Sequence, residues 1–155
     1  MGGAYPLRQC AVMDKEEQKH MDRVEEARRT LLALYGGSHS PLEESDPDFA
    51  AIKQRLVYGE LYAQEALDPV MRELILLAVA TTNQTMSEVK LHTCAALRSG
   101  ASPEAVKEAV YHCAPYIGLG KAEAAAAAVN EVLRTQGISL PPVSYTHLTL
   151  PTTPY

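Results

Sequence analysis

The clearest chemical pattern in this chain is a carboxylate and an imidazole four residues apart, Glu88 and His92. On a helix, side chains at this spacing share a face. A carboxylate beside an imidazole orients the ring and favours its protonated form, which makes His92 a candidate general acid or base. Such pairs are also frequent on exposed helix faces, so the spacing alone favours a purely structural role.

A second carboxylate, Glu73, stands beside Arg72 at the entrance of an apolar segment, residues 74–79. A carboxylate in such a segment needs a partner. One interpretation is an ion pair or a favourable charge in the first turn of a helix, and the other is a buried polar site. If Glu73 and His92 face each other across two helices, they form a carboxylate–imidazole proton relay.

Apolar residues at spacings of three and four predict that these side chains lie on helices. We expect Asp68, Ser87 and Ser102 to cap the starts of helices, and Gly100 and Gly137 to end them. The helix after Pro69 is apolar on nearly every side and should be buried, whereas Pro115 should interrupt a later one. The predicted helices, about six in all, span residues 14–35, 47–66, 69–80, 88–99, 103–114 and 121–136.

The chain of 155 residues has the length of one domain, which we place at residues 14–137. Residues 1–13 precede this domain as an N-terminal segment of mixed composition that contains Gly and Pro, and we expect them to be flexible. Residues 138–155 are rich in Pro and Thr and are predicted to be a disordered tail, whose part 144–155 has the look of a non-native cloning scar.

Composition excludes several classes of function. The formal net charge of −5 and the scattered Lys and Arg residues leave no basic patch for nucleic acid. The longest apolar run, residues 74–80, is far shorter than the roughly 20 residues that cross a bilayer, and no signal peptide opens the chain. We therefore expect a cytoplasmic protein without a membrane partner.

The remaining cysteines and histidines give weaker signals. Three cysteines, Cys10, Cys94 and Cys113, are an odd number without close pairing, so reduced thiols are expected. Cys94 lies two residues beyond His92 and therefore points to another side of the helix, which disfavours a thiol–imidazole pair. No third ligand stands at a metal-like spacing from His92, so no metal site is predicted. Tyr116 is a candidate for placing its hydroxyl in a pocket.

Several segments together resemble the carboxymuconolactone decarboxylase and alkylhydroperoxidase-D superfamily over residues 45 to 137. The segments are Arg72-Glu73-Leu74-Ile75, then Glu88-x-x-x-His92-x-x-x-Ala96-x-x-x-Gly100, then Ser102-Pro103-Glu104-Ala105-Val106-x-Glu108, and finally Tyr116-x-Gly118. The resemblance implies an all-α helical domain that assembles as a homo-trimer or homo-hexamer, with its site near a subunit boundary.

The resemblance also separates two chemistries. Peroxidase members carry Cys-x-x-Cys-x-x-x-His, in which two thiols cycle through a disulfide. Here the matching positions hold Thr85 and Glu88, so the chain is similar to the branch without this motif, and disulfide-cycling peroxidase activity is not expected. In the decarboxylase branch a carboxylated lactone loses CO2 without a cofactor, and a proton donor quenches the dienolate.

On this resemblance His92 is the proton donor, Glu88 orients it, and Glu73 is a relay behind it, with Tyr116 and Thr85 as candidate substrate-binding residues. The substrate is then a small carboxylated lactone or a related organic acid, because the longer N-terminal lactone-binding pattern of authentic decarboxylases is not seen. Two alternatives stay open: an antioxidant protein of the peroxiredoxin type that uses Cys94 or Cys113 in a non-standard way, and a non-catalytic oligomeric binding module.

Overall fold

The computed structural model describes residues 15–37 and 42–139. The predicted N-terminal lead and, apart from residues 138 and 139, the predicted tail lie outside the described residues, as do Cys10 and the candidate cloning scar. Within the described part all regular structure is helical, which confirms the all-α prediction. The elements are α1 (Lys15–Tyr35), α2 (Pro47–Gln54), η1 (Arg55–Leu61), α3 (Pro69–Asn83), α4 (Met86–Arg98), α5 (Pro103–Tyr111), α6 (Ala114–Ile117) and α7 (Leu119–Thr135).

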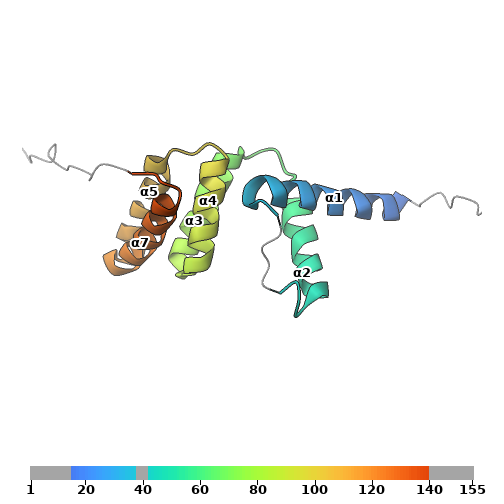
Figure 1. Cartoon of the computed structure of the whole chain (residues 1–155), viewed down its shortest axis with the longest axis horizontal. Helices are drawn as coiled ribbons and strands as arrows, with labels where there is room; N and C mark the ends of the chain where they lie inside the picture. The colour runs from blue at the N-terminus through green and yellow to red at the C-terminus, as the bar shows by residue number, and fades with distance from the viewer. Residues whose placement is uncertain (1–14, 38–41, 140–155) are drawn as a thin grey trace, which may run out of the picture. The chain divides into compact units, whose positions relative to one another are not determined.

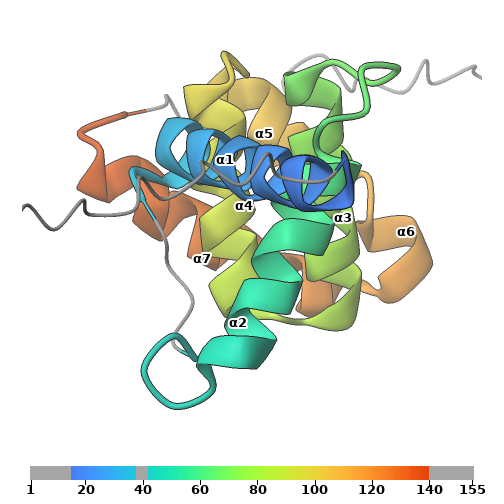
Figure 2. The same cartoon turned by 90° about the vertical axis from the view of Figure 1, so that its right-hand side faces the viewer.

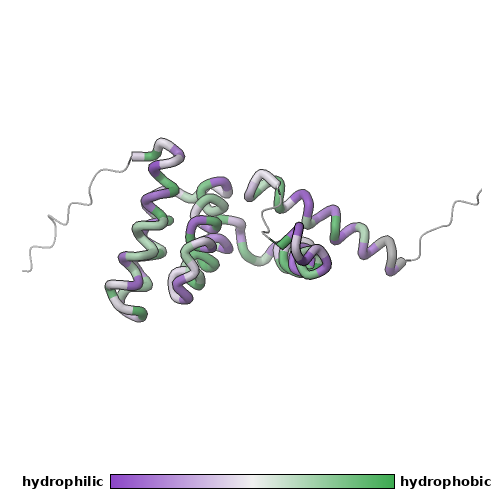
Figure 3. The backbone as a smooth tube through the Cα atoms, turned by 60° about the horizontal axis from the view of Figure 1, so that its bottom comes forward, coloured by the Kyte–Doolittle hydropathy of each residue, from purple (hydrophilic) through white to green (hydrophobic). Residues whose placement is uncertain are grey.

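The described residues form two compact units, one ending at Leu67 and the other beginning at Asp68. Six helices of the described part have eight or more residues, in line with the predicted number, and the others are the four-residue α6 and the π-helix η1. Along each helix hydrophobic and hydrophilic residues are mixed, as expected of amphipathic elements (Figure 3). No described helix has the combination of length and apolarity that crossing a bilayer requires.

In the first unit α1 lies across the continuous stretch formed by α2 and η1 (Figure 1). The prediction of one regular helix over residues 47–66 is wrong, because the α-helix gives way to a π-helix that ends at Leu61. The crossing is close: a Cβ at Gly59 would overlap the backbone carbonyl of Arg23. Tyr58, next to this glycine, packs edge-on against Tyr35 with ring centroids 5.7 Å apart.

The second unit is built around the pair α3 and α4, which a two-residue turn connects. Gln84 in this turn adopts a left-handed conformation, with φ of 59°. Helix α7 packs on α3, α4 and α5 (Figures 1 and 2), and its alanines allow that approach, because Ala125 and Ala128 are buried. The side chains that are fully buried in this core include Leu77, Val89, Val106, Val110 and Val129.

Local signals placed most helix ends correctly. Asp68 accepts a hydrogen bond from the Met71 amide at 3.0 Å, and Ser102 caps α5 in the same way. Gly100 and Gly137 have φ of 101° and 71°, which confirms both predicted stops.

Two other predictions of helix ends were wrong. Helix α4 begins at Met86 with Thr85 in the cap position and no side-chain cap, so Ser87 lies inside the first turn. Pro115 does not interrupt a long helix, because α5 already ends at Tyr111 and Pro115 lies in the first turn of the short α6, where a missing amide costs nothing.

The prediction that α3 is buried on nearly every side was also wrong. One face of α3 packs into the core through Leu77 and Ala80. Met71, Ile75 and Val79, spaced four residues apart on the opposite face, are about half exposed. We call these three residues the α3 stripe. A contiguous row of exposed apolar residues is typical of a surface that binds another protein, whereas single exposed apolar residues need no explanation.

Candidate active site

The site begins with a carboxylate that the fold places in the core of the second unit. Glu73 lies one turn before Leu77 on the face of α3 that packs against α4, and only 1% of its surface is exposed. A buried carboxylate without a partner would cost several kcal/mol, roughly, so the packing is tenable only if α4 supplies a donor.

That donor is His92, near the middle of α4. Its Nδ1 lies 2.9 Å from Oε2 of Glu73, and 12% of its side chain is exposed. Because an ionised carboxylate only accepts hydrogen bonds, Nδ1 carries the proton and donates it, which fixes the ring orientation. The other ring nitrogen, Nε2, is thereby left for chemistry. The structure thus brings together the two residues whose meeting the sequence could only suggest.

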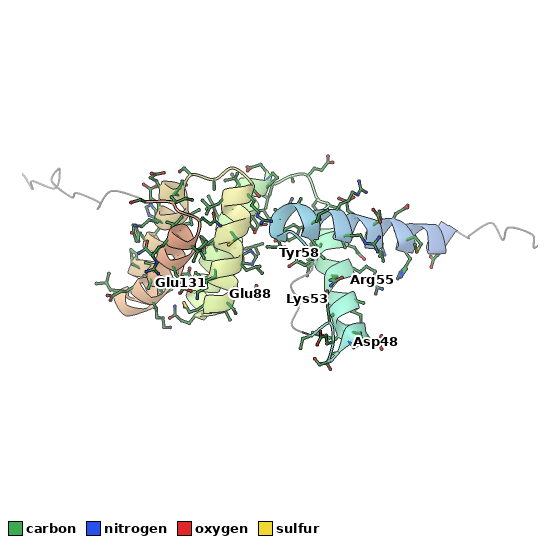
Figure 4. The ribbon with its side chains drawn as sticks, viewed as in Figure 1. Asp48, Lys53, Arg55, Tyr58, Glu88 and Glu131 are labelled. Carbon is green, nitrogen blue, oxygen red and sulfur yellow. The ribbon has the colours of Figure 1, made fainter. Side chains whose placement is uncertain are left out.

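Glu88 completes the arrangement on the other side of the ring. Its Oε2 lies 3.7 Å from Nε2 of His92, beyond hydrogen-bond distance, and 42% of its side chain is exposed. Figure 4 labels Glu88 on α4. Glu88 and His92 therefore do share a face of α4, as predicted, but the residue that accepts a hydrogen bond from the imidazole, Glu73, lies on α3. The result is a carboxylate at each ring nitrogen, one buried and one open to solvent.

This geometry does not suit a metal ion. Glu73 and Glu88 flank opposite nitrogens of the same ring, so their oxygens do not converge on one point. Among the residues that the structure describes, no three His, Cys, Asp or Glu side chains are grouped so that they could hold a metal. The arrangement can, however, hold the ring by a hydrogen bond at Nδ1 and leave Nε2 for proton transfer.

The two candidate substrate-binding residues are not joined to this pair by any contact that the structure records. Thr85 directs its hydroxyl to the carbonyl of Ala80 at 3.4 Å. Tyr116 lies in α6 with 89% of its surface exposed. Two hollows that the structure describes, of about 500 and 400 Å³, are lined by other residues, in the α1–η1 and the α5–α7 regions. A substrate-binding role for either residue therefore remains a prediction.

The two described cysteines are free thiols, and the hydrogen bonds recorded for them do not involve His92. Burial raises the pKa of Cys94, against smaller lowering effects of Arg98 and of the hydrogen bond from Gln136. Burial likewise raises the pKa of Cys113, whose Sγ donates to the carbonyl of Ala109 at 3.3 Å. Both effects reduce the thiolate fraction that redox chemistry requires.

One contact between α4 and α7 was missed in the sequence. Nζ of Lys90 lies 2.7 Å from Oε1 of Glu131, in an ion pair whose two side chains are both exposed. The hydrogen bond from Lys90 lowers the pKa of Glu131. The two residues are 41 positions apart, and no local pattern connects them.

Comparison with known proteins identifies the family of this chain. The family model described as "Carboxymuconolactone decarboxylase family" matches residues 47–131, more than half of the chain, and the match includes Glu73, Glu88 and His92. A protein named 4-carboxymuconolactone decarboxylase from Acinetobacter baylyi (strain ATCC 33305 / BD413 / ADP1) is 29% identical over 98 residues, which cover 63% of this chain and 73% of that protein. The chain therefore belongs to the carboxymuconolactone decarboxylase family.

Proposed function

We propose that this chain is a cofactor-free acid–base enzyme, a lyase of the decarboxylase type that acts on a small carboxylated lactone or a related organic acid. The observation that carries the proposal is the hydrogen bond between Nδ1 of His92 and the buried carboxylate of Glu73. The bond orients the imidazole and leaves Nε2 available to act as the acid. The name of the Acinetobacter relative supports the choice of reaction.

In the proposed reaction the bond between the substrate carbon and its carboxylate breaks, and CO2 leaves. The electron pair delocalises into the conjugated lactone carbonyl and gives a dienolate. His92 then donates the proton on Nε2 to the carbon, and the neutral ring takes up one proton from the solvent. Each turnover thus consumes one proton, and no electron acceptor or cofactor is needed.

The redox alternative has less support. A peroxide-reducing thiol needs a substantial thiolate fraction, whereas burial raises the pKa of both Cys94 and Cys113. In the resemblance to the superfamily, Thr85 and Glu88 stand where peroxidase members carry cysteines. We therefore propose that this chain belongs to the branch without the two-cysteine motif.

The test is turnover of 4-carboxymuconolactone by the purified protein, followed as CO2 release, with His92→Gln as the decisive variant. General acid catalysis contributes roughly 10²- to 10⁴-fold, so the variant should lose at least about a hundredfold in rate. His112→Gln is the matched control, because this histidine is exposed and follows α5. Equal turnover by His92→Gln and wild type would refute the assignment, and binding of the lactone without turnover would favour the non-catalytic module.

A further inference from the structure

A gradient of exposure runs across the imidazole of His92. The carboxylate at Nδ1, Glu73, is 1% exposed, the imidazole side chain is 12% exposed, and the carboxylate near Nε2, Glu88, is 42% exposed. The three groups therefore lead from the core of the second unit to bulk water. Their unequal access to water indicates that the two carboxylates have different tasks.

Glu73 is suited to holding the ring rather than to exchanging protons with solvent. Its carboxylate is shielded from water, and its hydrogen bond to Nδ1 is 2.9 Å long. A proton that reached Glu73 would have to pass through the imidazole or wait for α3 and α4 to separate.

Glu88 has the opposite properties. Its Oε2 lies 3.7 Å from Nε2, too far for a standing hydrogen bond but within reach of a small side-chain rotation or one bridging water. The spacing of four residues on α4 keeps the carboxylate over the same ring, and its exposure lets it meet solvent protons directly. The neighbouring cation on this helix, Lys90, is engaged with Glu131 instead.

We propose that Glu88 is the proton-exchange residue of this site, which carries protons between water and Nε2 of His92. After Nε2 has given its proton to the substrate carbon, the carboxylate of Glu88 takes up a proton from water or buffer and transfers it to the neutral ring. The carboxylate is thereby restored, and one solvent proton is consumed per turnover. The inference rests on the proposed function, because only that reaction requires Nε2 to be reprotonated after each turnover. The exchange of protons between water and Nε2 does not itself require a substrate.

The first experiment measures the exchange directly, without substrate. In protein labelled with ¹⁵N-histidine, NMR gives the rate at which the ring N–H protons of His92 exchange with water. Glu88→Gln keeps the shape of the side chain and should slow this exchange at least about tenfold, since an amide cannot relay a proton as a carboxylate does. Lys90→Gln, on the same helix, should leave it unchanged, and equal exchange in Glu88→Gln and wild type overturns the proposal.

The second experiment uses turnover. In Glu88→Gln, kcat should fall about tenfold or more in dilute buffer and recover as a small acidic buffer is added, because the buffer takes over the transfer. Wild type should be insensitive to buffer concentration. A loss of kcat that buffer does not restore, together with unchanged exchange, would mean that Glu88 only orients His92. If wild type does not turn over the lactone, the proposed reaction fails, while the NMR exchange still decides the role of Glu88.

Discussion

Removing the imidazole of His92 should destabilise the protein more than removing its carboxylate partner. In His92→Leu the carboxylate of Glu73 stays in the core at 1% exposure without a donor. Removing one partner of a buried ion pair in this way costs about 3–5 kcal/mol. In Glu73→Leu the imidazole loses its acceptor, but 12% of its side chain reaches solvent, so the cost should be about 1–3 kcal/mol.

The double variant Glu73→Leu, His92→Leu provides the strongest test of this reasoning. Because it leaves no unpaired polar group between α3 and α4, it should be more stable than His92→Leu alone. The two substitutions should thus be coupled by at least about 1 kcal/mol, beyond the roughly 0.5 kcal/mol within which independent sites add.

The assay is urea unfolding followed by circular dichroism at a single protein concentration, so that any association affects all variants equally. Lys90→Leu is a control from the same helix, where an exposed ion pair should contribute little. If the effects of the two single substitutions add in the double variant, Glu73 and His92 do not form the buried pair, and the basis of the proposed site is lost.

Three further predictions concern other parts of the described chain. Because burial raises the pKa of Cys94 and Cys113, both should react with iodoacetamide more slowly at pH 7 than the same thiols in urea, and alkylation should not abolish turnover. The hydrogen bond from Lys90 lowers the pKa of Glu131 below its ordinary value of 4.5. The contribution of ionised Glu131 to stability is therefore complete above pH 4.5 and is lost as the pH falls through the lower pKa of the folded state. The urea midpoints of Glu131→Gln and wild type should converge at that low pH. Ile75→Lys puts a charge on the α3 stripe and should weaken self-association at least about tenfold in analytical ultracentrifugation.

Each of these predictions has a matched control or a contrary outcome. Rapid alkylation of folded Cys94 at neutral pH would support the redox alternative. A constant difference between Glu131→Gln and wild type over the acid range would show that Lys90 does not act on that carboxylate. Thr82→Lys, at an exposed polar position near the end of α3, is the control for the stripe, and a monomeric wild type would contradict the expected homo-oligomer.

Much of the second unit could be predicted from sequence because its signals are local. The caps at Asp68 and Ser102 and the stops at Gly100 and Gly137 depend on residues within one turn, and all four were confirmed. The all-α fold class could be predicted in the same way, because it follows from the spacing of apolar residues along each helix. The start of α4 was placed two residues late, since Ser87 and Thr85 are both acceptable cap residues and only the surrounding turn selects between them.

The features that depend on packing could not be predicted in this way. That Glu73 contacts His92 follows from the approach of α3 and α4, and residues 19 positions apart give no local signal. The exposed α3 stripe was predicted to be buried, because an apolar sequence does not show which of its faces has a partner. The π-helix was missed since its sequence reads as an ordinary helix, and the close crossing with α1 is a tertiary effect.

The π-helix also constrains how this family member can change in length. Tyr58 and Gly59 are consecutive and both buried, and Tyr62 donates to the carbonyl of Val57, five residues back. A hydrogen-bonded turn of a π-helix holds one residue more than a turn of an α-helix does. Loss of a single residue between positions 55 and 61 would let the segment wind as an α-helix with little rotation of the residues beyond the deletion, because the tighter turns need one residue less. The crossing would still need a glycine opposite the carbonyl of Arg23, so a deletion that keeps Gly59 should be tolerated better than a bulky substitution at the glycine itself.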